Sequence, residues 1–376
     1  MAVNSMFISA CTIIINLEVI HKLNSTLASK QLHHGGRLRQ AAKDYGIDIN
    51  QWLDLSTGVS PWHYPETYCT SDYWNQLPQD NDGLLEAAMG YYCSQAQVNW
   101  HCLATAGSQA AIQTLPRMIS MQQSHFQTVL VPRIGYKEHQ KAWQAQGFTI
   151  ITYDCSPTVE QIAKADVLVV INPNNPLGCQ LDSQIQLNWL EQIHQQGGLM
   201  VVDEAFIDCD PHADASLLQT TSAPYSSSLI VLRSIGKFFG LAGARVGFCF
   251  ASPSNIEQLN LLLGPWQVNG PAREVVKRAL LNTEWQTNQR KKLAQSSCEL
   301  TQVLQRYFNR ITVTPLFIRV ETSTAPKIHH QLAEQAILVR LTDEKDALRF
   351  GLALDNIALT RLENALKKIL SYSINR

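Results

Sequence analysis

Long hydrophobic runs, an excess of one charge and closely spaced cysteine pairs are all missing from this sequence. The formal net charge of the 376 residues is −1, which gives no electrostatic basis for binding nucleic acid or an anionic membrane surface. The nine cysteines form no C-x-x-C pair, so the sequence predicts neither a zinc site nor a disulfide framework. We therefore expect a cytoplasmic protein without a metal, a nucleic-acid partner or a membrane partner.

The N-terminus offers only a weak targeting signal. Residues 6–15 are mostly apolar, but no lysine or arginine precedes them and the stretch is too short to span a membrane. We expect residues 1–32 to form an extension. Apolar residues make up 45% of the chain and charged residues 16%, which is typical of a globular protein, and the length exceeds the usual size of one core. The rest of the chain should therefore form two domains.

Apolar segments alternate with helical periodicity over residues 73–268. Continuously apolar strands that are separated by helices predict an α/β domain, in which helices cover both faces of a mostly parallel sheet. Beyond this region a long helix and four short strands, with two more helices, predict a smaller α+β domain over residues 269–376, joined by residues 33–72. The predicted strands of the large domain are 100–104, 128–131, 148–153, 167–171, 199–202, 229–232 and 246–250.

Four polar residues follow the predicted strands directly: Tyr136, Asn175, Asp203 and Lys237. Ligands of such folds bind at the carboxyl ends of the strands, so these residues should converge on one crevice. Lys237 lies among small and apolar residues, where a lysine loses its charge and becomes a nucleophile able to form a Schiff base with pyridoxal phosphate. The alternative is an ordinary strand-to-helix loop with a half-exposed lysine.

The other three residues could serve the same cofactor. Asp203 ends an apolar run, and a buried aspartate needs a cation such as a protonated pyridine nitrogen, although it could instead cap the next turn. Asn175 could donate to the phenolic oxygen of the cofactor or simply form a turn. Tyr136 could stack on the pyridine ring or be a core aromatic residue.

Several further groups could bind anions. A strand, a glycine turn and a helix start at Gly107, Ser108 and Gln109 offer free N–H groups to a phosphate, and Ser234 and Arg245 flank Lys237. Two arginines on predicted strands, Arg340 and Arg349, could hold a substrate carboxylate or phosphate, or be solvated edge charges. The loop with Gly58 and Val59 could lend N–H groups to a substrate, although connecting loops look the same.

In order and spacing, these motifs resemble the fold-type I pyridoxal-phosphate enzymes of the aspartate aminotransferase superfamily. The motifs on which this resemblance rests are Asn-Pro-Leu-Gly at 175–178, Asp-x-Ala-aromatic at 203–206, and Ser-x-x-Lys at 234–237 with an arginine eight residues later. Five stretches are similar to the histidinol-phosphate aminotransferase branch: residues 34–38, 55–61, 136–139, 203–208 and 348–352. Within that branch the chain is most similar to the threonine-phosphate decarboxylases of cobalamin biosynthesis.

The resemblance implies a role for each position. Lys237 would be the Schiff-base lysine, Asp203 would pair with the pyridine nitrogen, Asn175 would meet the phenolic oxygen and Tyr136 would stack on the ring. By the same resemblance, Arg349 would hold the substrate α-carboxylate, and His34 and Arg340 are candidates for the substrate phosphate. A homodimer is expected by the same analogy.

One position departs from the wider superfamily. The aromatic residue after Asp-Glu-Ala is often a tyrosine whose hydroxyl reaches the phenolic oxygen, whereas Phe206 cannot donate a hydrogen bond. This departure fits the decarboxylases better than the aminotransferases, and Asn175 is left as the main donor. The resemblance implies decarboxylation of a phosphorylated amino acid, L-threonine O-3-phosphate, to (R)-1-amino-2-propanol O-2-phosphate. Two alternatives are a histidinol-phosphate-type aminotransferase and a non-catalytic regulator that binds pyridoxal phosphate.

Overall fold

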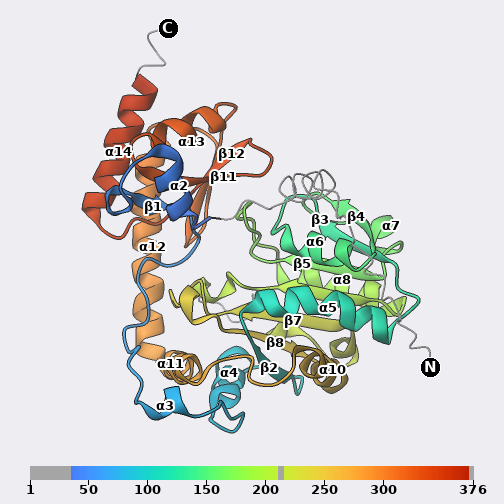
Figure 1. Cartoon of the computed structure of the whole chain (residues 1–376). Helices are drawn as coiled ribbons and strands as arrows, with labels where there is room; N and C mark the ends of the chain where they lie inside the picture. The colour runs from blue at the N-terminus through green and yellow to red at the C-terminus, as the bar shows by residue number, and fades with distance from the viewer. Residues whose placement is uncertain (1–34, 211–215, 372–376) are drawn as a thin grey trace, which may run out of the picture. The chain divides into compact units, whose positions relative to one another are not determined.

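Two β-sheets organise the chain (Figure 1). The computed structural model describes residues 35–210 and 216–371, so the expected extension over residues 1–32 and the candidate residue His34 lie outside the described part. Among the described helices, none is long and apolar enough to cross a membrane.

The larger sheet has seven strands in the order β2-β8-β7-β6-β5-β3-β4. Strands β4, β3, β5, β6 and β7 run parallel to one another, whereas β8 is antiparallel to both β2 and β7. This confirms the prediction of an α/β fold with a mostly parallel sheet. The strands are β2 (His101–Thr105), β3 (Thr128–Pro132), β4 (Thr149–Tyr153), β5 (Val167–Ile171), β6 (Leu199–Asp203), β7 (Leu229–Ser234) and β8 (Gly247–Ala251).

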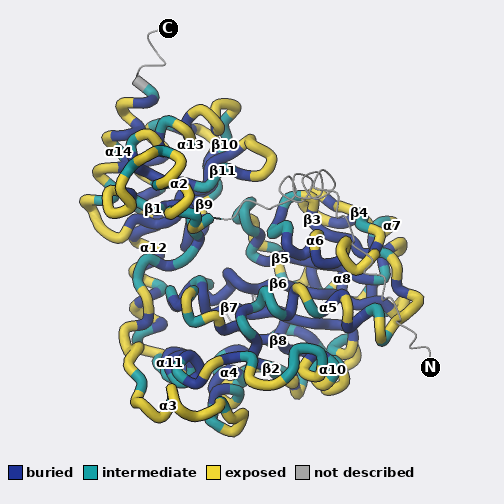
Figure 2. Tube along the Cα trace, viewed as in Figure 1, coloured by how far each residue is buried: buried dark blue, intermediate teal, exposed yellow. Residues whose placement is uncertain are grey.

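Both faces of this sheet are covered, which explains why its strands are apolar throughout. Side chains alternate along each strand, so Val169 and Val201 belong to one buried cluster while Val170 and Val202 belong to the other. Helices α5 (Ser108–Gln122), α6 (Glu138–Ala145) and α10 (Pro253–Leu263) cover the first face. Helices α4 (Leu84–Tyr92), α8 (Ser183–Gln195) and α11 (Gly270–Leu281) lie on the second. Figure 2 shows the central strands as buried and the outer helix surfaces as exposed.

The smaller sheet has five strands in the order β1-β11-β12-β10-β9. Its first strand, β1 (Leu53–Leu55), pairs in parallel with β11, so a segment from near the N-terminus completes a sheet formed by the C-terminal region. The other pairings are antiparallel. These strands are β9 (Ile311–Val313), β10 (Phe317–Glu321), β11 (Ile337–Leu341) and β12 (Ala347–Gly351), and the helices around them are α2 (Leu38–Tyr45), α13 (Ala325–Ala333) and α14 (Asn356–Ser371).

The long helix α12 (Thr283–Gln305) links the two sheets. Near its start Trp285 stacks on Phe239, two residues after Lys237, with an interplanar angle of 14°, and farther along the helix packs against β9 and β10 (Figure 1). A helix of this length spans about 34 Å. It therefore connects the Lys237 loop with the small sheet.

Some helices were not predicted. Helices α10 and α11 each have a proline in the first turn, where its missing N–H costs nothing. Both have a side-chain N-cap, Ser252 and Asn269 respectively. The short helices α3 (Asp72–Asn75), α7 (Val159–Ile162) and α9 (Leu217–Thr220) were also missed.

Candidate active site

Lys237 follows the buried strand β7, in a turn that contacts the Gly58-Val59 loop and the ring of Phe206. Its backbone carbonyl accepts a hydrogen bond from the Ser60 N–H at 3.0 Å, which ties the Gly58-Val59 loop to the lysine loop. Its Nζ lies 5.3 Å from the centroid of the Phe206 ring. Phe206 also lies close to the Gly58-Val59 loop, since a Cβ at Gly58 would lie 3.1 Å from Phe206 Cε1. The amine of Lys237 therefore lies over an aromatic ring.

The surroundings of Lys237 lower its pKa from 10.5 to about 8. Burial is the largest cause, the positive charges of Arg349 and Arg245 act in the same direction, and the negative charge of Asp203 opposes them. A primary amine with this pKa is partly unprotonated near neutral pH and can attack an aldehyde carbon. These charges also show that the structure brings Lys237 together with Asp203, Arg245 and Arg349.

Asp203 ends the neighbouring strand β6 and has a buried histidine partner. Its Oδ2 lies 2.9 Å from His139 Nε2, and its Oδ1 accepts a hydrogen bond from the Ala205 N–H at 3.1 Å. Only 4% of Asp203 and 2% of His139 are exposed. Because an ionised carboxylate only accepts hydrogen bonds, Nε2 donates, and this fixes both the histidine tautomer and the direction of the carboxylate. Sequence reasoning missed His139, which lies near the start of α6, three residues after Tyr136.

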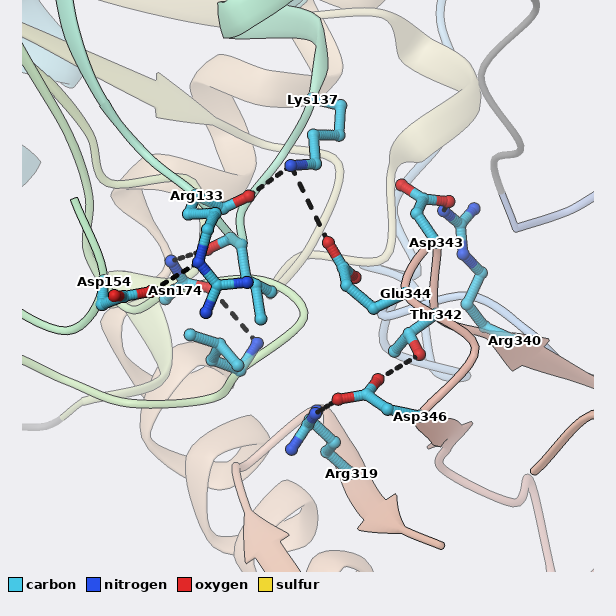
Figure 3. Close-up of polar contacts among 12 residues, drawn as sticks. Arg133, Lys137, Asp154, Asn174, Arg319, Arg340, Thr342, Asp343, Glu344 and Asp346 are labelled. Atoms are coloured by element: carbon cyan, nitrogen blue, oxygen red, sulfur yellow. Dashed lines mark hydrogen bonds and ion pairs between the residues drawn. The ribbon is translucent and has the colours of Figure 1, made fainter. Parts of the chain in front are cut away.

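Asn175 lies in a loop that its neighbours make rigid. Asn174 Nδ2 donates to the Ile134 carbonyl at 3.1 Å, its Oδ1 accepts from the Leu177 N–H at 3.1 Å, and Figure 3 shows Asn174 beside the loop that carries Arg133. The Oδ1 of Asn175 accepts from Arg349 Nη1 at 2.5 Å. With its oxygen engaged, the amide nitrogen of Asn175 is the group left to donate, as the predicted role requires.

The start of α5 forms a narrow cradle with Arg245. Gly107 has φ = 72°, and a Cβ at this position would lie 2.6 Å from Arg245 Nη2. A Cβ at Gly247 would lie 2.3 Å from the Ser108 backbone nitrogen. The helix that begins at Ser108 has 15 residues, so its first N–H groups and its dipole favour an anion beside the Arg245 guanidinium. Nearby Ser234 accepts from the Gly236 N–H at 3.3 Å.

Tyr136 and Gln109 are joined directly. The Tyr136 hydroxyl donates to Gln109 Oε1 at 3.0 Å, while Gln109 Nε2 donates to Glu138 Oε2 at 3.2 Å. Burial is the main cause that raises the pKa of Tyr136 to about 12, so the ring stays neutral. The negative charges of Glu138 and Asp203 add to this effect, and the positive charges of Arg245 and Arg340 oppose it.

Gln289 is a second buried polar residue that sequence reasoning missed. It lies on α12, is 4% exposed, and its Nε2 donates to Ser60 Oγ at 2.7 Å, to the Trp62 carbonyl at 3.1 Å and to the Phe238 carbonyl at 3.3 Å. It therefore joins the Gly58-Val59 loop to the residue after Lys237. The sequence did carry a signal for Gln289. It is a polar residue between Trp285 and Leu293, at a spacing that places all three on the apolar side of the helix.

Arg340 and Arg349 lie opposite each other on β11 and β12. Arg349 Nη2 donates to the Ser56 carbonyl at 2.7 Å, and its buried Nε has no hydrogen-bond partner within residues 35–210 and 216–371. Burial first, and then the charge of Arg340, lowers the pKa of Arg349 to about 9. Like charges directly across an antiparallel pair repel, so this arrangement favours a bound anion.

These donors fit pyridoxal phosphate. The α5 cradle with Ser108, Ser234 and Arg245 suits a phosphate, the buried carboxylate of Asp203 suits a cationic ring nitrogen, and Lys237 suits an aldehyde. Apart from His34, every predicted site residue lies in the described part of the chain, and the contacts above draw those residues into one region. Their individual roles stay predictions.

The fold is that of the fold-type I pyridoxal-phosphate enzymes. A family model described as "Aminotransferase class I and II" matches residues 80–366, and the chain belongs to this family.

Two relatives are more specific. The chain is 40% identical to a threonine-phosphate decarboxylase of Pseudomonas aeruginosa, over 89% of this chain and 97% of that protein. It is 34% identical to a threonine-phosphate decarboxylase of a Sinorhizobium species, over 91% and 99%.

The fold has a solved counterpart in a histidinol-phosphate aminotransferase from Sinorhizobium meliloti, crystallised in complex with pyridoxal-5'-phosphate. The TM-score is 0.79 at 15% identity, over 92% of this chain and 97% of that one. At this identity the likeness concerns the fold alone.

Proposed function

We propose that the protein is a pyridoxal-phosphate-dependent decarboxylase of L-threonine O-3-phosphate, which yields (R)-1-amino-2-propanol O-2-phosphate for cobalamin biosynthesis. The observation that carries the proposal is the pair Arg340 and Arg349, opposite each other across two strands and close enough to perturb each other and the residues around Lys237. Two cations suit a substrate with two anionic groups. Both relatives named as threonine-phosphate decarboxylases align over almost their whole length.

The chain's own residues would bind and orient the reactants. Arg349 would hold the α-carboxylate, and Arg340 would hold the phosphate, with His34 as a second candidate. When bound, pyridoxal phosphate supplies an electron sink for the carbanion left at Cα. Asp203 would keep the ring nitrogen protonated, and His139 would keep Asp203 directed at it.

The reaction replaces the carboxylate with one proton. The Cα–carboxylate bond breaks, its electron pair stays on Cα, and carbon dioxide leaves. Lys237, whose pKa is about 8, would deliver the proton to Cα. Anchoring of both anions decides which bond at Cα stands perpendicular to the ring, and therefore which bond breaks.

The histidinol-phosphate-type aminotransferase is the second candidate. It would use the same lysine and the same phosphate anchor, but Cα–H would stand perpendicular to the ring in place of the carboxylate bond. Phe206 gives the phenolic oxygen no second donor, and this departure from the wider superfamily fits a decarboxylase better than an aminotransferase by resemblance. The regulator alternative has less support, because a formal net charge of −1 gives no overall excess of positive charge for binding nucleic acid.

We also propose a homodimer in the cytoplasm. Tyr68, Trp74 and Leu77, just before α4, are 80%, 75% and 63% exposed, and a second copy of the chain would cover this apolar surface. The cysteines within the described residues are all free thiols, which suits a reducing compartment.

The experiment assays the purified holoenzyme for decarboxylation and for amino transfer in parallel. One sample receives L-threonine O-3-phosphate, and released carbon dioxide is trapped. The other receives an amino donor with imidazole-acetol phosphate, and formation of histidinol phosphate is measured. Carbon dioxide release that Lys237→Ala abolishes supports the proposal, whereas amino transfer without carbon dioxide release refutes it.

A further inference from the structure

Three arginines form a row across the small sheet. Arg349 on β12 lies opposite Arg340 on β11 and opposite Arg319 on β10. Residues directly opposite each other in antiparallel strands project from the same face. The row therefore concentrates positive charge on one face of the sheet.

The three arginines differ in how far carboxylates neutralise them. Arg319 pairs with Glu321 and, at 3.0 Å, with Asp346. The Nη2 of Arg340 lies 3.1 Å from Asp343 Oδ1. Within the described residues, Arg349 has no ion pair with a carboxylate. Charge neutralisation thus falls from Arg319 through Arg340 to Arg349.

Asp343 lies at the tip of the hairpin between β11 and β12. Two hydrogen bonds to Asp346, in the same turn, fix the hairpin. Thr342 Oγ1 donates to Asp346 Oδ1 at 2.8 Å, and Arg319 grips the other oxygen of Asp346, as Figure 3 shows. The adjacent Glu344 points elsewhere, with its Oε1 3.8 Å from Lys137 Nζ. The two neighbouring carboxylates of one tip therefore serve two different cations.

We propose that Asp343 is an internal competitor for phosphate at Arg340. It occupies the Arg340 guanidinium until a dianionic phosphate group displaces it, so it sets how tightly phosphorylated ligands bind. This inference rests on the proposed function, because that function assigns a phosphate to Arg340. A monoanion that replaced Asp343 would exchange one negative charge for another, whereas a dianion adds one.

The size of the effect follows from exposure. The side chains of Arg340 and Asp343 are 17% and 31% exposed, so water weakens their attraction. Partly exposed ion pairs of this kind change an equilibrium by about two- to five-fold. Removal of the Asp343 charge should strengthen phosphate binding by that factor.

The experiment measures the Kd of inorganic phosphate on the holoenzyme by calorimetry, together with the KM for L-threonine O-3-phosphate. In the holoenzyme the cofactor fills its own phosphate cradle. The variants are Asp343→Asn, the rescue variant Asp343→Glu, and the matched control Glu344→Gln, which removes one charge from the same tip. Thermal unfolding of each variant verifies that the hairpin change leaves the protein folded.

Asp343→Asn should lower both the Kd and the KM by about two- to five-fold, while Asp343→Glu and Glu344→Gln stay near the wild-type values. An unchanged or higher Kd in Asp343→Asn overturns the inference, and so does an equal decrease in Glu344→Gln, which would mean a general effect of charge. Absence of phosphate binding to the wild type also overturns it. Carbon dioxide release is followed in the same samples, so failure of the proposed function is seen separately.

Discussion

The Nε2 of His139 lies 2.9 Å from Oδ2 of Asp203, and both side chains are almost completely buried. The contact joins α6 to the end of β6 and sets the direction of the carboxylate proposed to face the cofactor. A hydrogen bond to a buried charge is worth more than one between neutral groups, which makes the contact measurable.

His139→Leu should lower the free energy of unfolding of the cofactor-free protein by about 2–3 kcal/mol, because Asp203 loses a charge-assisted partner. The matched control is Tyr153→Phe, which removes a buried neutral bond from the Tyr153 hydroxyl to the Val169 carbonyl at 3.0 Å. The control should cost about 1 kcal/mol. Urea unfolding measures both, and equal losses would contradict a charged role for the His139 contact.

Gln289→Met should slow turnover by roughly tenfold, because the Ser60 loop and the Lys237 loop lose their shared donor. Gln286→Met is the control one turn earlier on α12, where Gln286 is 3% exposed and donates to the carbonyls of Ala279 and Leu280. Both variants should lose similar stability. Only Gln289→Met should also shift the absorbance of the lysine-bound cofactor, and identical spectra and rates in the two variants would refute a positioning role.

Gly107→Ala should weaken cofactor binding by tenfold or more, because the new methyl group would overlap Arg245 at the start of α5. Gly147→Ala has the same kind of backbone strain, with φ = 92°, but nothing lies within 4 Å of its Cβ position. Titration of cofactor-free protein with pyridoxal phosphate gives both dissociation constants. A similar loss in the two variants would show that strain alone is responsible.

The lowered pKa of Lys237 should make stability depend on pH. Between about 8 and 10.5 the unfolded lysine binds a proton that the folded one releases, so the stability of cofactor-free wild type rises with pH in this window. Lys237→Met has no such titration. The difference in unfolding free energy between the two proteins should be constant below pH 8 and should change by on the order of 3 kcal/mol, in favour of wild type, up to pH 10.5. A difference that stays flat would place Lys237 in solvent.

Much of the site could be predicted because it follows from strand ends. Tyr136, Asn175, Asp203 and Lys237 come soon after strands that run parallel, and the carboxyl ends of parallel strands share one edge. Predicting that these four residues lie close together therefore required only the correct order of the apolar segments along the chain. The fold class followed from the same alternation of strands and helices.

The partners of these residues could not be predicted in the same way. The contacts of His139 with Asp203 and of Gln289 with Ser60 join elements far apart in the sequence, and the register that puts Arg340 opposite Arg349 depends on the hairpin turn. Helices α10 and α11, which both begin with a proline in the first turn, were not predicted.

The most direct test of the central claim follows the α-carbon of L-threonine O-3-phosphate in deuterated water. Decarboxylation keeps the original Cα hydrogen and adds one solvent deuteron, so each aminopropanol phosphate should carry one deuterium at C1 and be matched by one carbon dioxide. Formation of a keto acid, with the Cα hydrogen lost and no carbon dioxide released, would contradict the account and indicate amino transfer at the same lysine.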